Sequence, residues 1–509
     1  MTDFANPILP GMHPDPTVCR VERDFYLACS SFEYFPGVPI FHSRDLVHWR
    51  QLGHVLTRKS QLDLTTTPSS GGIYAPTLRH DGTTFYMVTT HVERGHFVVT
   101  ARDPRGPWSD PCWLDGDGID PSLAFVDSRI YFTRNGRGAD RDHPFVYQAE
   151  LARGLHGLEH ATKPRVIWKG TGGIWPEAPH LYRRGDWYYL LTAEGGTSYG
   201  HSVVIARSRR PYGPFTASPH GPLLTHRDRP RHPIQATGHA DLVELDDGST
   251  WAALLGIRPA GGRHHHLGRE TFLARVEWGD DGWPRIERLE LRMEGPSLRR
   301  SGRVGDGSEH VDFSSRRLPP SLVFVRNPAR RSWSLRQRPE FLRLWGQAAS
   351  LSDVASPALV CRRQQHLEMT ARTRLTFEPR GPNEQAGLCV RANESFHAAL
   401  LVTAGEHGRE VRLVRRLAGR QTTLGSAHVA SGAVTLEIGA TADEYVFRAG
   451  TGRRVEELGR VRTRAFSAET ILQRTGRHHF TGAMIGLYAT GAGSRAKSPA
   501  DFHWFDYAA

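Results

Sequence analysis

The sequence predicts an all-β protein in which a five-bladed β-propeller is followed by a β-sandwich. Short apolar strands alternate with turns rich in Gly, Pro, Asp and Asn, and helical periodicity is not evident over any useful length. A unit with one strongly aromatic strand recurs five times before about residue 295, and longer alternating strands without this unit follow. A chain of 509 residues is long enough for two such domains, each with its own core.

The repeated unit predicts the propeller. The aromatic strands of the five units align on five residues: Tyr26, Tyr86, Tyr131, Tyr189 and Trp251. The spacings between these residues are 60, 45, 58 and 62. A unit of this length holds about four short strands, which is one blade of a β-propeller. We therefore expect five blades within residues 1–298.

A change in composition predicts the second domain. The stretch GPSLRRSGRVGDGSEH is polar and rich in Gly, Ser and Arg, so we place a linker at residues 299–315. Beyond it, strands such as HLEMTARTRLTFEP (366–379) and HAALLVTAG (397–405) alternate apolar and polar residues. This pattern is typical of a β-sandwich, which we expect over residues 316–509.

Three of the five units carry an acidic residue at almost the same place. Asp15, Asp120 and Glu177 lie 11, 11 and 12 residues before the aligned aromatic residue, and each has a proline within the next two positions. Taken alone, Asp15 and Asp120 read as ordinary turn residues next to proline, whereas Glu177, between Trp175 and two prolines, is an unusual choice for a surface loop. However, independent turn residues need not fall in phase with the following strand. If equivalent positions of the blades face one axis, three carboxyl groups converge on one pocket, an arrangement suited to acid–base chemistry on a sugar.

Composition excludes several other classes of protein. The net charge is +12, but the arginines are scattered and lysine is rare, so no basic groove for nucleic acid is expected. No stretch approaches the roughly 20 apolar residues of a membrane span. The N-terminal segment MTDFANPILPGMHPDP does not resemble a secretory signal, and the five cysteines lack metal-type spacing. We therefore expect a reduced, cytoplasmic protein.

A set of motifs resembles glycoside hydrolase family 43. It comprises NPILPGMHPDPTV, SSFEYFPGVPIFHSRDLVHW, GGIYAPTL, DPSL, EAPHLYRRGDWYYLLTAEGGTSYGH, GHAD, LGRET and the ending TGAMIGLYATG…ADFHWFDY. The motifs occur in order over essentially the whole chain and are most similar to the β-xylosidase branch. The resemblance implies a five-bladed propeller with a C-terminal, concanavalin-like β-sandwich. It also implies hydrolysis of β-xylosides or α-L-arabinofuranosides with inversion at the anomeric carbon.

The resemblance assigns a role to each of the three acids. Asp15 matches the general base that activates water, and Glu177 matches the general acid that protonates the leaving oxygen. Asp120 matches a third carboxylate that orients the acid and sustains its raised pKa. Inversion requires an acid and a base about 6.5–9.5 Å apart with water between them, which blades across one pocket can supply.

Further residues match substrate-binding positions: Phe32, Tyr74, Thr197, His239, Arg269 and Phe480. Arg269 matches an arginine that meets substrate hydroxyls and a catalytic carboxylate, with a structural salt bridge as the alternative. His239 either binds the sugar or the acid, lines an axial calcium or water site, or is a satisfied core histidine. Phe480, from the sandwich, is expected to cap the rim of the pocket.

Three positions depart from the family pattern. Tyr74 stands where close relatives usually carry tryptophan, Ala178 where many carry glycine, and Asp241 where xylosidases often carry serine. We expect these changes to touch the pocket wall and the loop of the fifth blade. They therefore bear on the choice of sugar more than on the chemistry.

These observations predict an inverting exo-glycosidase that releases D-xylose from the non-reducing ends of short β-1,4-xylo-oligosaccharides. An α-L-arabinofuranosidase, or a bifunctional enzyme, is the alternative with the same mechanism. A catalytically silent sugar-binding propeller is the rival from another class, which loss of any acid would favour. No cofactor or metal ligand set is expected to be required, calcium near His239 being the one ion considered. The resemblance further predicts a homo-oligomer, a dimer or tetramer.

Overall fold

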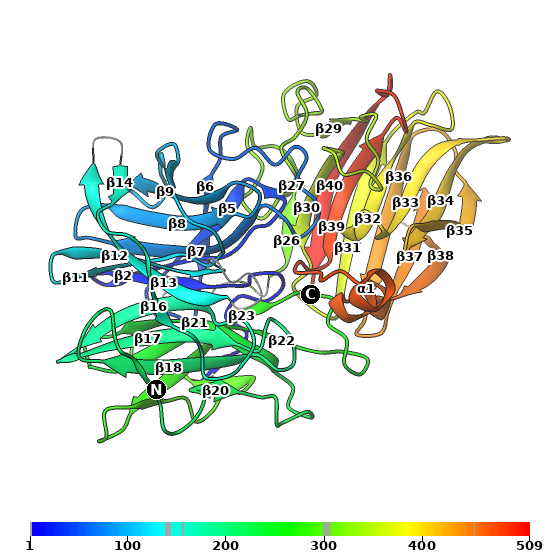
Figure 1. The fold of residues 1–509 in the computed structure, drawn as a ribbon. Helices are drawn as coiled ribbons and strands as arrows, with labels where there is room; N and C mark the ends of the chain where they lie inside the picture. Colours follow the sequence, from blue (N-terminus) through cyan, green and yellow to red (C-terminus); the bar gives the residue numbers. More distant parts are fainter. Residues whose placement is uncertain (1–2, 138–143, 155–156, 299–304, 306, 452–453) are drawn as a thin grey trace.

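The computed structural model describes residues 3–137, 144–154, 157–298, 305, 307–451 and 454–509. These residues form a propeller and a sandwich that pack against each other (Figure 1). The predicted fold class is therefore confirmed. Among the described residues, no helix is long and apolar enough to cross a membrane.

The propeller consists of five small antiparallel sheets, each of which runs outwards from an inner strand at the axis. The first sheet contains β2 (Thr17–Val21), β3 (Asp24–Ala28), β5 (Gly37–Ser43) and β6 (Arg50–Leu56). The second contains β7 (Ile73–His80), β8 (Phe85–His91), β9 (Gly95–Ala101) and β10 (Cys112–Leu114). The third contains β11 (Ser122–Val126), β12 (Arg129–Gly136), β13 (Phe145–Gly154) and β14 (Gly157–His160), and β15 (Arg165–Trp168) also pairs with β13. The fourth sheet contains β16 (Glu177–Arg184), β17 (Trp187–Glu194), β18 (Ser202–Ser208) and β19 (Thr216–Ala217), and β20 (Leu224–Thr225) also pairs with β18. The fifth contains β21 (Gln235–Glu244), β22 (Thr250–Ile257), β23 (Glu270–Trp278) and β24 (Pro284–Arg285).

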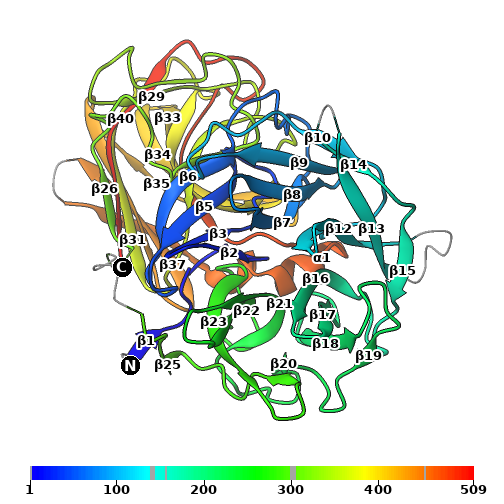
Figure 2. The ribbon, with the colours of Figure 1, turned by 90° about the vertical axis from the view of Figure 1, so that its left-hand side faces the viewer.

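The five sheets close into a ring around one axis (Figure 2). Inner strands β2, β7, β11, β16 and β21 each contact the next, and β21 returns to β2. The ends of the propeller segment also meet, because β1 (Asp3–Ala5) pairs with β25 (Arg292–Glu294).

The first hairpin of each blade explains why the aromatic residues recur in phase. Tyr26, Tyr86, Tyr131 and Tyr189 lie on the second strand and pair with the residue seven positions earlier on the inner strand. In the fifth blade Trp251 pairs with Val243, eight positions earlier. Four blades therefore share one hairpin register.

The second domain is a sandwich of two large sheets. One sheet runs β28 (Trp333–Ser334), β29 (Leu342–Trp345), β40 (Pro499–Ala508), β31 (Met369–Thr376), β36 (Ala433–Ala440), β37 (Glu444–Thr451), β38 (Glu456–Arg462), with β26 (Glu309–Val311) also on β40. The other runs β35 (Arg420–His428), β34 (Gly408–Leu417), β33 (Phe396–Gly405), β32 (Gln385–Asn393), β39 (Met484–Thr490), β30 (Ala358–Arg363), β27 (Val323–Val325), β4 (Tyr34–Phe35).

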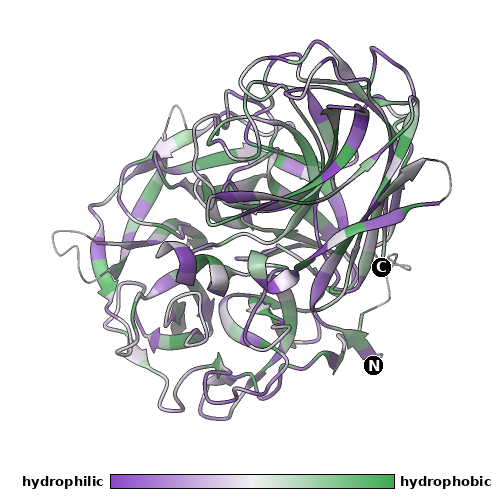
Figure 3. Ribbon diagram, turned by 90° about the vertical axis from the view of Figure 1, so that its right-hand side faces the viewer, coloured by the Kyte–Doolittle hydropathy of each residue, from purple (hydrophilic) through white to green (hydrophobic). Residues whose placement is uncertain are grey.

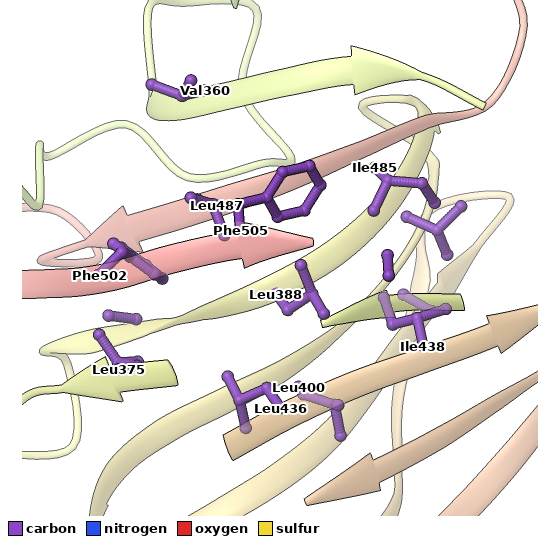
Figure 4. Close-up of a cluster of buried hydrophobic side chains, with 14 of the residues drawn as sticks. Val360, Leu375, Leu388, Leu400, Leu436, Ile438, Ile485, Leu487, Phe502 and Phe505 are labelled. Atoms are coloured by element: carbon purple, nitrogen blue, oxygen red, sulfur yellow. The ribbon is translucent and has the colours of Figure 1, made fainter. Parts of the chain in front are cut away.

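Alternating apolar residues hold the sandwich together. Leu388 and Leu487 of one sheet pack with Leu436 and Phe502 of the other in one apolar core, as Figure 4 shows. Apolar and polar segments alternate along the strands of both domains (Figure 3). Burial of each of these side chains contributes roughly 1.5–3 kcal/mol to the stability of the folded sandwich.

The two domains are joined by more than a linker. Strand β4 lies within the first propeller unit but pairs with β27 and so extends a sandwich sheet. Strand β26 lies inside the range predicted as a linker, 299–315, yet pairs with β40. Residues 299–304 and 306 of that predicted linker lie outside the described residues.

A short helix, which the sequence pattern did not indicate, completes the junction. Helix α1 (Ala468–Thr475) begins after Ser467, whose side chain accepts a hydrogen bond from the Thr470 N–H. It ends at Gly476, whose φ of 68° suits glycine. Glu469 of this helix contacts His265 of the propeller at 2.7 Å, so α1 fixes the following chain, residues 476–482, against the propeller.

Candidate active site

A cavity of about 480 Å³ lies where the five inner strands begin. The nine residues singled out from the sequence all line it: Asp15, Phe32, Tyr74, Asp120, Glu177, Thr197, His239, Arg269 and Phe480. Because every blade brings its inner strand to the axis in the same direction, residues in register along the sequence meet in space. The cavity therefore gathers acidic groups that lie more than 150 residues apart in the chain.

Asp15 is held as an ionised carboxylate. It precedes β2 in a left-handed backbone conformation, with φ of 55°, and its side chain is 7% exposed. Arg269 donates to Oδ1 at 2.7 Å, and the Ser30 hydroxyl donates to Oδ2 at 2.5 Å. Burial alone would raise the pKa of Asp15, but Arg269, His239 and Ser30 outweigh it and hold this pKa below its usual value.

Asp120 has the same local backbone and a different electrostatic balance. It precedes β11 with φ of 53°, and Oδ2 accepts from the Ala178 N–H at 3.1 Å. Burial, together with the negative charge of Asp15, raises the pKa of Asp120 to about 6 against the opposing effect of His239. At neutral pH Asp120 is therefore an ionised group close to protonation.

Glu177 begins β16, one residue farther from its aligned tyrosine than the two aspartates. The cause is a bulge between Glu177 and His180, where Ala178 adopts a φ of 52°. Asn135 fixes the approach to this bulge, since its amide donates to the Pro176 carbonyl at 2.7 Å. The bulge re-aims the carboxyl into the cavity and accounts for a spacing of 12 in place of 11.

The pKa of Glu177 lies well above its usual value. Burial is the main cause, and the negative charges of Asp120 and Asp15 act in the same direction, while Arg269 opposes them. The side chain is only 16% exposed. The cavity thus favours the protonated form of Glu177 and the ionised form of Asp15.

Arg269 connects Asp15 to the rest of the pocket. Besides Asp15 it donates to the Thr197 hydroxyl at 3.2 Å. Its guanidinium also lies 5.7 Å from the ring centroids of Phe32 and Phe480. Arg269 forms a salt bridge, as the alternative interpretation required, but both of its members, Arg269 and Asp15, line the cavity.

Three aromatic rings form one wall of the cavity. Phe32 lies 5.3 Å from Tyr74 and 6.4 Å from Phe480, and Tyr74 lies 5.9 Å from Phe480, measured between centroids. Ser70 fixes two of them, because its carbonyl accepts from the Tyr74 hydroxyl and its own hydroxyl accepts from the Phe480 N–H. Phe480 comes from the sandwich, so both domains build the cavity.

His239 lies between the two aspartates. Its Nδ1 is 3.6 Å from Asp15 Oδ1 and 4.0 Å from Asp120 Oδ2, and its φ of 47° places it in the bulged part of β21. In the part of the chain that the structure describes, no group of three or more His, Cys, Asp or Glu residues is placed to hold a metal ion. The calcium ion considered near His239 stays a prediction.

One interpretation from the sequence was wrong. Asp241 was expected at the pocket wall or the fifth-blade loop, but it does not line the cavity. It lies two residues beyond His239, fully buried, and binds Arg79 of the second blade through both carboxylate oxygens. A register shift between Gly238 and Asp241 interrupts the regular alternation of the inner strand, and Asp241 lies farther along this strand than His239, among the inner strands of the other blades.

Sequence reasoning also missed several residues. The further lining residues include Ile119, Asn135, Ile174, Ser198 and His478. Trp175, which also lines the cavity, is 46% exposed and has a φ of 53°. Asn135 lies four residues after Tyr131, as Ser30 lies four after Tyr26, but the fourth and fifth units carry Ala193 and Leu255 at this offset, so the offset alone does not mark a pocket residue.

The geometry supports proton transfer in two directions within one cavity. An ionised carboxylate can accept a proton from water, and a protonated carboxyl can donate one to a leaving oxygen. Two carboxyl groups whose surroundings move their pKa values apart are the usual basis of such a division of roles.

Comparisons with known proteins agree with this arrangement. A family model described as glycosyl hydrolases family 43 matches residues 4–284, and one described as a beta xylosidase C-terminal Concanavalin A-like domain matches residues 310–508. A non-reducing end alpha-L-arabinofuranosidase of Bacteroides ovatus, BoGH43B, is 42% identical over 99% of this chain and 94% of its own length.

Two other relatives cover the whole chain. A xylosidase/arabinosidase of Butyrivibrio fibrisolvens is 37% identical over 98% of both chains. The crystal structure of a xylan beta-1,4-xylosidase from Bacillus halodurans superimposes with a TM-score of 0.94 at 34% identity, covering 99% of this chain and 100% of that one.

Proposed function

Because the chain belongs to glycosyl hydrolases family 43, as a glycoside hydrolase of the xylosidase or arabinofuranosidase type, we propose that it releases D-xylose from short β-1,4-xylo-oligosaccharides with inversion. The family match confirms the resemblance found in the motifs. It also sets aside the silent sugar-binding propeller, since the chain is an enzyme and retains all three acids. The opposite pKa shifts of Asp15 and Glu177 in one cavity carry the proposal.

Asp15 acts as the general base. Its Oδ1 and Oδ2 are held by Arg269 and Ser30, so the carboxylate is fixed in position and ionised. Water bound against Asp15 attacks the anomeric carbon from the face opposite the leaving group and gives its proton to Asp15. The new C–O bond therefore forms on the other face of the sugar, which inverts the configuration.

Glu177 acts as the general acid. It gives its proton to the glycosidic oxygen while the bond from that oxygen to the anomeric carbon breaks. Asp120 binds the Ala178 N–H directly beside Glu177, and its negative charge keeps the proton on the acid until it is needed. Solvent then returns the acid and the base to their starting protonation states.

The shape of the cavity fits an exo mode of attack. Phe32, Tyr74 and Phe480 form an apolar wall against which one pentose ring packs, while Arg269 and Thr197 offer polar contacts to its hydroxyls. Ile174 and Trp175 are 57% and 46% exposed and lie three and two residues before the acid in sequence. We place the leaving sugar over these two residues, since it must depart on the side of Glu177.

An α-L-arabinofuranosidase is the second candidate, favoured by the 42% identity with the Bacteroides ovatus enzyme. The hydroxyls of arabinofuranose can overlay those of xylose, so the same acid and base would serve both sugars. A bifunctional enzyme, the description of the Butyrivibrio fibrisolvens relative, combines the two.

Turnover of two nitrophenyl glycosides tests the proposal. Purified protein is assayed with the β-D-xyloside and the α-L-arabinofuranoside side by side, and then with xylobiose. We expect xyloside turnover together with xylobiose cleavage. A preference for the arabinoside would establish the second candidate, and no turnover of either by folded protein would overturn both.

Three further properties are proposed and can be checked separately. We expect activity to survive dialysis against a chelator, since the acid–base steps need no metal; loss restored by calcium would place an ion at His239. We expect a dimer or tetramer by light scattering. Cytoplasmic residence, proposed for a protein whose five cysteines are all free, is tested by fractionation of the source cells.

A further inference from the structure

His201 is clamped beside the acid by two blades. It directly precedes β18, and its side chain is 1% exposed. Its backbone N–H donates to the Ser198 carbonyl, and its own carbonyl accepts from the Thr225 hydroxyl at 2.9 Å. On the other side the ring packs on Gly238, where a Cβ atom would come within 2.1 Å of the imidazole. The ring therefore has little freedom to turn.

The two ring nitrogens of His201 have different surroundings. Nδ1 lies 3.3 Å from the Ala236 carbonyl oxygen, which can only accept, so Nδ1 carries the hydrogen. Nε2 is buried, has no hydrogen-bond partner among the described residues, and lies 3.9 Å from Glu177 Oε1. A neutral imidazole with its hydrogen on Nδ1 presents a bare lone pair at Nε2.

The surrounding charges keep this imidazole neutral. Burial, followed by His239 and Arg269, lowers the pKa of His201 to about 3, and only the Ala236 carbonyl and Asp15 oppose this. Glu177 faces Asp120, Asp15 and Arg269 as well as His201. A bare lone pair accepts a hydrogen bond from a protonated carboxyl and repels an ionised one. The Nε2 lone pair therefore raises the pKa of Glu177, as the negative charges of Asp15 and Asp120 do.

We propose that His201 is a positioning residue for Glu177: Nε2 accepts the hydrogen of the Glu177 carboxyl and holds the acid protonated and oriented until a glycosidic oxygen replaces the imidazole as acceptor. The inference rests on the proposed role of Glu177 as the acid. A small rotation of the carboxyl closes the gap of 3.9 Å. His201 itself touches no sugar and transfers no proton.

Two opposite roles for His201 predict opposite changes in the pH profile. If Nε2 accepts from the acid, removing it makes Glu177 easier to ionise, and the alkaline limb of kcat/KM moves to lower pH. If His201 were instead a cation paired with an ionised Glu177, removing it would move the alkaline limb to higher pH. A histidine needed only for folding would lower activity without moving either limb.

Three variants test the proposal by their pH profiles on xylobiose and on whichever nitrophenyl glycoside is the better substrate. His201→Phe removes both nitrogens, His201→Asn retains a donor near Nδ1 without an acceptor at Nε2, and His201→Gln retains an acceptor near Nε2. We expect Phe and Asn to move the alkaline limb down by about one pH unit, a tenfold change in the ionisation equilibrium. Gln should move it less, and the limb set by Asp15 should stay in place.

If His201→Phe does not fold, the alkaline limbs of His201→Asn and His201→Gln can still be compared, and this comparison decides the test. Equal shifts in Asn and Gln, an unmoved alkaline limb, or a limb moved to higher pH would overturn the proposal. Thermal unfolding of each variant identifies losses that arise from misfolding.

A double variant separates this inference from the role of the acid. In a Glu177→Ala background, His201→Phe should cause no further loss on the nitrophenyl glycoside, because there is no carboxyl left to position. A further loss would show that His201 acts elsewhere and would overturn the inference alone. If Glu177→Ala itself lost equally on xylobiose and the nitrophenyl glycoside, the acid assignment would fail instead.

Discussion

Two mostly buried carboxyl groups lie along the same propeller axis, and their surroundings shift their pKa values in opposite directions. One is Asp241, below the cavity, and the other is Glu177, which lines it. Both belong to inner strands of the propeller. The difference between them lies in how completely their partners compensate the loss of water.

Asp241 is fully compensated. Its carboxylate accepts from Thr17, from the Val18 N–H, from Tyr182 and twice from Arg79, at distances of 2.6–3.0 Å. Although burial favours the neutral form, these partners hold the pKa of Asp241 well below its usual value. Since Asp241 lies on β21 and its partners come from three other inner strands, β2, β7 and β16, this site ties four blades together.

Glu177 is compensated poorly. No hydrogen bond to its carboxyl is present within the described ranges, and the imidazole of His201 lies 3.9 Å from it. Burial and two neighbouring negative charges therefore keep its pKa high. The comparison teaches that a buried carboxyl short of donors favours its protonated form and so has a proton to give, whereas one rich in donors stays ionised.

The largest expected effect comes from removing the base. Asp15→Asn keeps the size of the side chain but cannot take a proton from water, so kcat/KM should fall by about 10³-fold or more on xylobiose and on aryl glycosides alike. Steady-state kinetics with pure protein measures the loss. Substantial residual turnover on either substrate would remove Asp15 as the base.

Glu177→Ala should show a loss that depends on the leaving group. An activated nitrophenyl group needs less protonation than a sugar, so turnover of xylobiose should fall more than that of the nitrophenyl glycoside. The ratio of the two kcat/KM values, variant against wild type, gives the result. Equal losses on both substrates argue against Glu177 as the acid.

At the compensated site the effect should fall on stability. Arg79→Met leaves Asp241 buried without its cation, which costs roughly 3–5 kcal/mol in comparable buried pairs. Urea unfolding measures this loss, and the folded fraction should keep nearly normal kcat. A loss below about 1 kcal/mol would mean that Arg79 contributes little beyond a surface ion pair.

A smaller effect is expected when one ring of the aromatic wall of the cavity is removed. Phe480→Ala removes one ring contributed by the sandwich, and the lost apolar contact is worth roughly 1–2 kcal/mol. We expect KM for xylobiose to rise several-fold with little change in the pH profile, because no ionisable group is altered. A change confined to the pH limbs would contradict the assignment of Phe480 to the wall.

The sequence allowed the fold and much of the cavity lining to be predicted because the propeller repeats. Equal offsets from Tyr26, Tyr131 and Tyr189 place three acids at equivalent points, and the ring geometry turns that register into proximity. The spacing of 12 at Glu177 reflects a bulge. A bulge adds one residue without an obvious sequence signal.

Other features could not be predicted because they depend on contacts between distant segments. Strand β4 leaves the first blade to join the sandwich, and a two-residue strand carries no periodicity of its own. His201 acquires its place only through Gly238 and Ala236 of the next blade. Asp241 was misplaced because a register shift before it interrupts the regular alternation of the strand.

The unfolding temperature of Glu177→Gln, measured as a function of pH, tests most directly whether the buried Glu177 carboxyl lacks donors to replace the water it has lost. A carboxyl whose pKa is raised by folding stabilises the protein fully below its unfolded pKa, about 4.3, and that stability is lost as pH rises through the folded pKa. Gln carries no charge and loses nothing. The account predicts that Glu177→Gln unfolds at a higher temperature than wild type at pH 8, with the gap closing near pH 4.

Asp241→Asn, measured alongside, should give the opposite sign. Its lowered pKa stabilises the fold above the unfolded pKa of about 3.9, and this stability is lost only as pH falls through the folded pKa. This variant should be less stable than wild type at pH 8, with a smaller deficit in acid. If Glu177→Gln were instead destabilised at both pH 8 and pH 4, the acid would be a compensated structural carboxyl and the account would be contradicted.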